Sequence, residues 1–317
     1  MERNIHHSAM VINTIQSPSS AVNSPIAASW FRSAMKFGLN PEINQKQDLM
    51  LGSELAVERD RHGALLAVAR PILDNVFRSV GGTGCCVILT SCDGLILESR
   101  TSAAEANDFE DARLTPGANW SEAKEGTNGI GTCLIDERPV TIYRDQHFYE
   151  KNIGMSCVDA PVRDHRGRLL AALDVSTCRH DHDKAILGLI SSIVTDAARK
   201  IEGDYFRQAF PRARIVHAGN ASDQAPALLA VDNDDLVIGA TRAARRMFGL
   251  DDLMIASTLP ARDILGNTSV SQELLESERS ALRRALARTE GNVSEAAKQL
   301  GIGRATFYRR MKRCGID

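Results

Sequence analysis

The spacing of apolar residues changes along the chain, and each spacing predicts a different kind of element. Residues 61–80 carry apolar side chains every three or four positions, at Leu65, Ala69, Ile72, Val76 and Val80. This is the period of an amphipathic helix, in which Pro71 predicts a kink. A longer helix is predicted after residue 184, with a buried face made of Ile186, Ile190, Ile193, Ala197, Ile201 and Tyr205.

Between these helices the apolar period becomes that of short strands. "CCVILT" and "LILES" flank "SCDG", in which Asp93-Gly94 is typical of a hairpin turn. "SCVDAPV" and "RLLAALDVS" form a second pair around Gly167, and a short strand up to Tyr143 lies between the pairs. Antiparallel hairpins enclosed by helices predict an α+β sensor-type domain at residues 59–210.

Two other segments before the tail show a weaker pattern. In the polar region 1–58, "AASWFRSAMKFGLNPE" predicts a short helix that Gly38 and Pro41 end, with a buried face of Ala27, Phe31, Ala34 and Met35. We interpret this region as a docking arm. After a polar linker at 211–226, "ALLAVDNDDLVIGATRAARRMFGL" predicts strand, turn, strand and helix. The unit at 222–265 has only about 45 residues, which is marginal for an independent core, so we interpret it as a remnant or docking piece.

The tail at 272–317 has the pattern of a helix-turn-helix. Its first helix has an apolar stripe at Leu274, Leu275, Leu282 and Leu286, and "GN" at 291 and 292 ends it. Ser294 is expected to cap a second helix whose apolar positions are Ala296, Ala297 and Leu300. Gly301 permits a tight turn. In a third helix from Arg304, Phe307 and Met311 are predicted to face inward.

The outer face of that third helix predicts contact with double-stranded DNA. We place Arg304, Thr306 and Arg309 near base edges, and Arg310, Lys312 and Arg313 near phosphates, with Tyr308 also on this face. Residues 278–317 contain ten Lys/Arg and four Asp/Glu, although the whole chain has a net charge of −2. A basic end on an acidic body indicates that the tail meets a polyanion. The alternative is a solvated basic face on an interaction helix.

Composition limits the other classes of function. No apolar stretch reaches the length of a membrane span, and no leader segment opens the sequence, so we expect a cytoplasmic protein that does not contact a membrane. Seven cysteines without a CxxC pair predict reduced thiols that act as small buried hydrophobes. In "RHDHD" (180–183 with Arg179), His180 and His182 alternate with acids and do not converge, so we expect a helix start and no metal. No cofactor is predicted.

Several of these segments resemble known families. Residues 278–316 resemble the Fis-type helix-turn-helix, dimeric in that family, with Gly303 where relatives often have Ser or Asn. "WSEAKEGTNGIGTCLIDERPVTIYRDQHF" and "MSCVDAPVRDHRGRLLAALDVS" are similar to the GAF domain of acetoin-catabolism regulators, a branch of the sigma-54-dependent activators. "SWFRSAMKFGLNPE" resembles their N-terminal segment and 222–265 their PAS-like linker. Met155 and Gly129 depart from the usual Trp and Ala.

The resemblance implies a sensor for a small-molecule effector. By analogy with GAF domains, the candidate pocket residues are Trp120, Asn128, Cys133, Phe148 and Cys157, each of which could equally be plain core. The glycines of "EGTNGIGT" match neither a P-loop nor a dinucleotide turn, so a tight turn lining a pocket is favoured over a nucleotide site.

The resemblance also shows what this sequence omits. The activators carry an ATPase domain between sensor and DNA reader, whereas here only a few residues intervene and no Gly-Lys dipeptide occurs. We therefore expect a homodimeric DNA-binding regulator without ATPase activity, with RNA polymerase or a full-length relative as possible partners. The alternatives are a thiol enzyme that reduces free methionine sulfoxide, using two of Cys85, Cys86, Cys92, Cys133 and Cys157, or a sensor of redox state or nitric oxide with thiols or iron.

Overall fold

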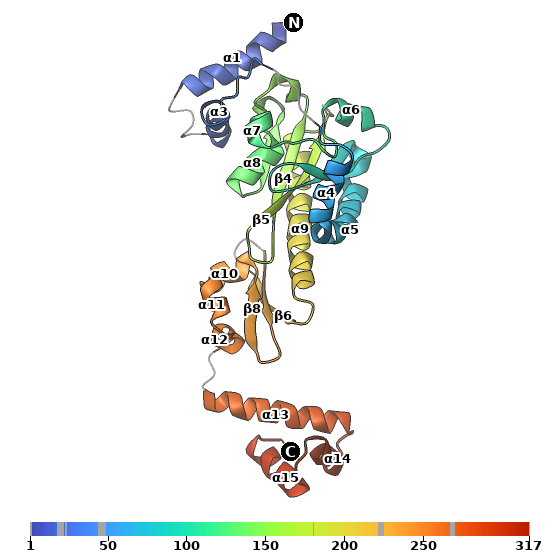
Figure 1. Cartoon of the computed structure of the whole chain (residues 1–317), viewed down its shortest axis with the longest axis vertical. Helices are drawn as coiled ribbons and strands as arrows, with labels where there is room; N and C mark the ends of the chain where they lie inside the picture. The colour runs from blue at the N-terminus through green and yellow to red at the C-terminus, as the bar shows by residue number, and fades with distance from the viewer. Residues whose placement is uncertain are drawn as a thin grey trace.

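The computed structural model describes residues 2–17, 22, 24–43, 49–179, 181–220, 225–266 and 270–316, with the side chains of 2–6, 220 and 270–274 left out. His180 and the side chain of Leu274, both used in the predictions, lie outside this description. Three units follow one another along the molecule (Figure 1). We call them the sensor unit (49–209, with the arm of 2–43 beside it), the second unit (214–265) and the tail (270–316).

The sensor unit is built on one antiparallel sheet with the strand order β2-β1-β5-β4-β3. Its strands are β1 (Cys85–Thr90), β2 (Ile96–Arg100), β3 (Val140–Tyr143), β4 (Ser156–Arg163) and β5 (Leu169–Thr177). The two predicted hairpins are confirmed, and Gly94 and Gly167 have positive φ at their turns. Short 3-10 turns occur at Gly81–Thr83, Arg144–Gln146 and Glu150–Asn152.

Helices cover both faces of this sheet, which explains why nearly every residue of its central strands β1 and β4 is buried. On one face lie α5 (Gly63–Val80) and α9 (Lys184–Ala209), packed on side chains such as Val87 and Leu89. The other face is covered by α6 (Ala106–Asp111), α7 (Glu122–Glu125) and α8 (Gly129–Asp136). Cys86 and Ile88 of β1 point to this second face, where they pack with Ile130 and Cys133 of α8.

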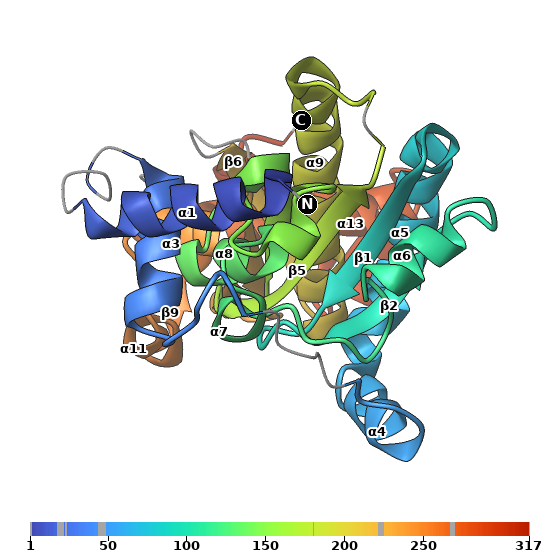
Figure 2. The same ribbon diagram turned by 90° about the horizontal axis from the view of Figure 1, so that it is seen from above.

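The N-terminal arm packs beside α7 and α8, away from α5 (Figure 2). It consists of α1 (Glu2–Gln16) and α3 (Pro25–Met35), and α4 (Ser53–Arg61) follows. The helix predicted here is confirmed, and Ala27 is buried as predicted, but two other residues of the predicted buried face are exposed. Phe31 and Met35 are 39% and 66% exposed, and Trp30 is buried instead. The buried face is centred on Trp30, which packs with Phe148 and Tyr149 of the sensor unit, while Ser29 and Ser33 on the same side form hydrogen bonds with Thr127.

Helix α9 is 26 residues long and begins at Asp183, whose carboxylate accepts hydrogen bonds from the backbone N–H groups of Ala185 and Ile186. The predicted helix start is thus confirmed. Its buried face is rotated from the predicted one, because Leu187 and Val194 are buried while Ile186 and Ile193 are each 36% exposed. The C-terminal part of α9 leaves the first sheet and reaches the second unit.

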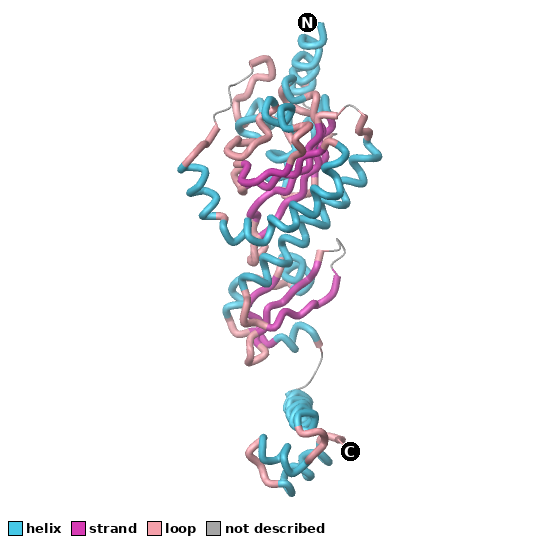
Figure 3. Tube along the Cα trace, turned by 90° about the vertical axis from the view of Figure 1, so that its right-hand side faces the viewer, coloured by secondary structure: helices cyan, strands magenta, loops and turns pink. Residues whose placement is uncertain are grey.

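The second unit has its own sheet, in the order β6-β7-β8-β9 (Figure 3). Its elements are β6 (Arg214–Asn220), β7 (Pro226–Val231), β8 (Leu236–Ala240), α10 (Arg242–Phe248), α11 (Asp252–Ala256), β9 (Leu259–Pro260) and α12 (Ala261–Leu265). The prediction of a linker at 211–226 is wrong, because β6 occupies it. This strand is polar because it lies at the edge of the sheet and pairs only with β7.

The tail consists of α13 (Val270–Arg288), α14 (Val293–Gln299) and α15 (Arg304–Arg313). Its core contains Leu282, Ala285, Ala296, Ala297, Phe307, Met311 and Cys314. Leu275 and Leu300 were predicted to be buried but are 41% and 39% exposed. The predicted cap is also wrong, because Asn292 accepts from the N–H groups of Ser294 and Glu295 and so begins α14 two residues earlier.

The remaining general predictions concern cysteines and membrane spans. Five of the seven cysteines are buried, Cys178 is half-buried and Cys92 is exposed, and all seven are free thiols. Within the described part of the chain, no helix combines the length and the apolar character that crossing a bilayer would require.

Candidate DNA-binding helix and sensor site

The third tail helix, α15, presents most of its polar side chains to solvent. Phe307 is fully buried and Met311 nearly so, as predicted. Gly301 forms the tight turn before the helix with φ of +66°, and Gly303 begins α15 without a side-chain cap. Of the predicted DNA-contacting residues, Thr306 is half-buried, and the exposed ones are Arg304, Tyr308, Arg309, Arg310, Lys312 and Arg313.

Two of these arginines are held against the first tail helix. Glu278 of α13 forms ion pairs with Arg310, at 3.3 Å, and with Arg313. The hydrogen bond from Arg313 lowers the pKa of Glu278. At the other end of α15, the guanidinium carbon of Arg304 lies 5.7 Å from the centre of the Tyr308 ring. The ion pairs therefore fix α15 against α13, while Arg304 lies at the end of the helix that a helix-turn-helix inserts into the groove.

The sensor unit contains a pair of buried carboxyl groups on the face of the sheet under α8. Asp159 of β4 lies directly opposite Asp174 of β5, and the two side chains are 1% and 0% exposed. The hydroxyl of Ser176 donates a bifurcated hydrogen bond to Asp174, at 2.8 and 3.0 Å. Neither oxygen of Asp159 accepts a hydrogen bond from an N–H or O–H group that the structure describes.

Burial determines the charge of this acid pair. It raises the pKa of both carboxyls, with the charge of Asp174 adding to the effect on Asp159, and it brings the pKa of Asp174 to about 7. Two carboxylates that face each other in a dry interior cannot both be ionised, so near neutral pH the pair shares a proton.

The thiols nearest this pair are uncharged. Gly129, the first residue of α8, lies directly above it, since a Cβ there would be 2.0 Å from Asp159 Oδ2 and 2.5 Å from the Cβ of Cys157. Burial raises the pKa of Cys133 and Cys157 well above the usual range. His147 Nε2 lies 3.5 Å from Cys157 Sγ, but burial lowers the pKa of this imidazole to about 4, so it supplies no cation. Protonated thiols are weak nucleophiles.

The other predicted pocket residues have separate positions. Trp120 is buried in the apolar cluster under α8, and its indole N–H donates to the carbonyl of Arg113 at 2.8 Å. Asn128 caps α8, because its Oδ1 accepts from the N–H of Gly131 at 2.8 Å. Phe148 belongs to a different cluster, formed with the arm. Only Cys133 and Cys157 of the predicted set therefore adjoin the acid pair.

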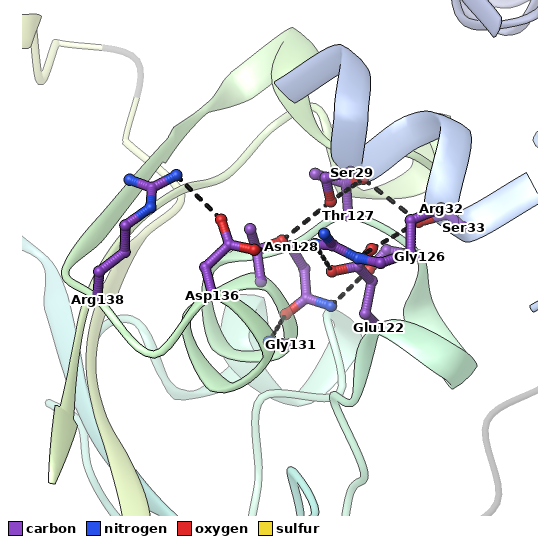
Figure 4. A network of polar contacts seen from close by, with 11 residues as sticks. Ser29, Arg32, Ser33, Glu122, Gly126, Thr127, Asn128, Gly131, Asp136 and Arg138 are labelled. Atoms are coloured by element: carbon purple, nitrogen blue, oxygen red, sulfur yellow. Dashed lines mark hydrogen bonds and ion pairs between the residues drawn. The ribbon is translucent and has the colours of Figure 1, made fainter. Parts of the chain in front are cut away.

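A polar network closes the region from the arm side (Figure 4). Arg32 of α3 donates to both carboxylate oxygens of Glu122, at 2.8 and 2.7 Å, and Glu122 is only 1% exposed. The hydroxyls of Ser29 and Thr127 are 2.8 Å apart. A bidentate pair between a planar guanidinium and a buried carboxylate is geometrically specific. It fixes the position of the arm over the start of α8.

Sequence reasoning missed the acid pair and the Arg32–Glu122 contact. Each strand carried a visible signal, since Asp159 and Asp174 interrupt otherwise apolar runs, and buried charge in a strand needs a reason. No comparable signal marked Arg32, because an arginine on a short helix is usually a solvated residue. Among the residues described, no group of three or more His, Cys, Asp or Glu side chains is arranged to hold a metal ion.

The described chain combines a sensor-like α+β unit, a second small sheet and a basic helix-turn-helix. A family model described as "MimR, N-terminal domain" matches residues 8–203, and the chain belongs to this family. A second model, "Bacterial regulatory protein, Fis family", matches residues 274–313. Between α12 and α13 lie only residues 266–269, so no ATPase domain separates the sensor side from the tail.

Two relatives that match this chain are named as regulators. The acetoin catabolism regulatory protein of Cupriavidus necator is 30% identical over 226 residues, 70% of this chain and 34% of the relative. The propane 2-monooxygenase operon transcriptional activator MimR of Mycolicibacterium smegmatis is 32% identical over 163 residues, 50% of this chain and 26% of the relative. The chain thus matches about a third or less of these proteins. The predicted resemblance to acetoin regulators is confirmed.

One solved structure shares the fold. The chain aligns with the structure titled as the Escherichia coli DhaR(N)–DhaL complex with a TM-score of 0.53 and 17% identity, covering 80% of this chain and 86% of the other. The mixed helix and sheet architecture predicted from the sequence is therefore confirmed.

Proposed function

We propose that this protein is a transcription regulator that binds duplex DNA through α15 and responds to a small molecule in its sensor unit. The observation that carries the proposal is the exposed cationic face of α15 in a tail that matches the Fis family. Because its target is the bacterial genome, we place such a regulator in the cytoplasm. Because the sensor side adjoins the tail without an ATPase between them, it would act by occupying sites, by contacting RNA polymerase or by competing with a full-length relative.

The contacts of α15 support separate roles for its cations in DNA binding. Arg304 and Thr306 lie in the N-terminal half of the helix, where base edges are read, and Arg309 follows about one turn after Thr306. Arg310 and Arg313 are oriented by Glu278, which suits phosphate contacts that set register. We propose a homodimer, because two copies of a single helix-turn-helix reading two half-sites give both affinity and symmetry.

The acid pair indicates the chemistry of the effector. Asp159 offers carboxyl oxygens without a donor from the described residues, in a buried place where an unsatisfied polar group is costly. A small molecule with hydroxyl groups would supply the donors. The names of the relatives, which refer to acetoin and propane oxidation, support small alcohols, diols and hydroxyketones.

The DNA-binding proposal is tested by selecting genomic fragments with the purified chain at fixed moderate salt and measuring affinity for the recovered sites. Arg304→Ala is expected to cost about 1–3 kcal/mol and to relax preference at one base position. Lys312→Ala is expected to weaken all sequences equally and to reduce the salt dependence. Arg61→Ala, on the exposed surface of α4, is the matched control. Absence of any duplex binding at low salt would refute the proposal.

The effector is tested separately, by titrating acetoin, butane-2,3-diol, propan-2-ol and glycerol while following the tryptophan fluorescence of the chain, to which Trp30 and Trp120 contribute. At least one compound should bind the wild type and lose affinity in Asp159→Ala, while Asp196→Asn, which lies on the exposed surface of α9, keeps it. If no compound binds, the effector class is wrong, although the DNA-binding proposal stands. The thiol-enzyme and iron-sensor alternatives have no observation in their favour, because the inner thiols are protonated.

A further inference from the structure

A cavity of about 270 Å³ lies where the sensor unit meets the second unit. Its walls come from the turn after α8, from β4 and α9 of the sensor unit, and from β7 and α10 of the second unit. The junction can be followed in Figure 3, between the two groups of strands. The lining contains neither Asp159 nor Asp174, so this cavity is separate from the acid pair.

Arginines outnumber acids among the residues that line the cavity. Its basic residues are Arg138, Arg163, Arg199, Arg242 and Arg246, and its acidic residues are Glu137, Asp164 and Glu202. Burial raises the pKa of Glu202 to about 7, which leaves this acid only partly charged at neutral pH. Two of the arginines also pair with acids beside the lining, Arg138 with Asp136 at 2.9 Å and Arg199 with Asp196 at 3.3 Å.

The acids in the wall are already engaged by this chain. Glu137 forms ion pairs with Arg163, at 2.8 Å, and with Arg242, at 3.3 Å. A carboxylate oxygen of Glu202 accepts from the backbone N–H of Arg163 at 2.8 Å. Each guanidinium carries five N–H donors, so one carboxylate partner cannot use all of them. Arg163 and Arg242 therefore keep N–H groups beyond those used in these ion pairs, and an anion in the cavity can accept from them.

The rest of the lining is apolar and small. It includes Pro139, Ala160, Pro161, Ala198, Pro226 and Ala243. A site of this kind suits a compound with a short carbon body and an anionic group, because the body contacts proline and alanine while the anion meets arginine. Inorganic ions would leave the apolar part of the wall without a partner.

We propose that this cavity binds a small organic acid, with its carboxylate held by arginines from both units and its carbon body against the proline and alanine wall. Arg199 comes from α9 of the sensor unit, and Arg242 comes from α10 of the second unit. A ligand that contacts both stabilises their present arrangement relative to any arrangement in which the units separate. The cavity is thus a second effector site, independent of the one under α8.

The proposal is tested by isothermal titration calorimetry of the full chain with pyruvate, succinate and citrate at fixed ionic strength. Pyruvamide and succinamide, which have similar shapes and no charge, are the ligand controls. We expect at least one acid to bind and its amide to bind at least tenfold more weakly. Binding of neither acids nor amides, or equal binding of an acid and its amide, would overturn the proposal.

Two variants separate this cavity from other basic surfaces. Arg242→Gln and Arg199→Met remove one charge from each unit, and each should weaken the acid at least tenfold. Arg61→Gln removes an exposed arginine that is also paired with an acid, at Glu58, and should leave affinity within twofold. Unchanged affinity in both cavity variants would place the anion elsewhere and refute the assignment. Thermal unfolding of each variant checks that it is folded, and if one variant is unfolded the other still decides.

Discussion

Replacing Asp174 by asparagine should change how the stability of the sensor unit depends on pH. Burial raises the pKa of Asp174 from its ordinary value of 3.8 to about 7. Between these values the native state holds more protons than the unfolded chain, so the contribution of Asp174 to the free energy of unfolding falls as pH rises and becomes level above about 7. Asparagine keeps the shape, cannot ionise, and can donate from its amide to the carboxylate of Asp159.

The size of the effect follows from the linkage between protons and folding. One pKa unit corresponds to about 1.4 kcal/mol, so between pH 5 and pH 8 this group alone removes roughly 3 kcal/mol from the wild type. The difference in unfolding free energy between Asp174→Asn and the wild type should therefore widen by about 2–3 kcal/mol over that range, in favour of the variant. Glu202, whose pKa is also raised to about 7, contributes equally to both proteins and cancels in the difference.

Urea unfolding followed by tryptophan fluorescence measures this directly. The chain has two tryptophans, and both Trp30 and Trp120 are buried in or against the sensor unit, so the signal does not report the tail. Asp196→Asn, with its carboxyl 73% exposed, is the control and should run parallel to the wild type. A gap between Asp174→Asn and the wild type that stays constant from pH 5 to pH 8 would refute the reasoning about the acid pair.

Three further changes test other contacts. Arg32→Gln leaves the buried carboxylate of Glu122 without its cation and should cost the sensor unit about 2–4 kcal/mol in urea unfolding. Adding Glu122→Gln should restore part of this stability. An unchanged free energy of unfolding in Arg32→Gln would mean that the pair is not formed. Phe307→Ala should cost about 3–5 kcal/mol and abolish DNA binding without moving the fluorescence transition; retained DNA binding would contradict this. Gly129→Ala should destabilise the sensor unit by about 1–3 kcal/mol, because the new methyl group would clash with the buried carboxylate on β4. Gly154→Ala, with open space around it, is the control and should not destabilise it. Equal urea midpoints for the two variants would argue against the close approach of Gly129 to this carboxylate.

Periodicity in the sequence was sufficient for elements with a strong apolar signal. The helix at 63–80 and both hairpins of the sensor unit were predicted, because each buries a regular set of side chains. It failed for β6, whose polar residues reflect an edge position that no local pattern reveals. It also misplaced the buried face of α9, since Ile186 and Leu187 are equally apolar and only packing against the sheet decides between them.

The candidate sites were less predictable than the fold. The tail could be predicted because its turn, apolar positions and charges lie within forty residues of one another. The acid pair depends on the register between β4 and β5, which puts Asp159 opposite Asp174 although fifteen positions separate them in the sequence. The arginine-lined cavity draws on residues from both units, and such a meeting of distant segments follows only from tertiary structure.

Helix α9 can transmit movement from the sensor unit to the second unit. Its first half packs on the core of the sensor unit through Leu187 and Ile190, and near its end Phe206 packs against Leu228 and Ala230 of the second sheet. A helix of this length is about 39 Å long, so a tilt of about 5° at one end moves the other by about 3 Å. Because α9 belongs to the cores of both units, a small change in packing under the first sheet would displace the sheet of the second unit, from which the chain continues into the tail.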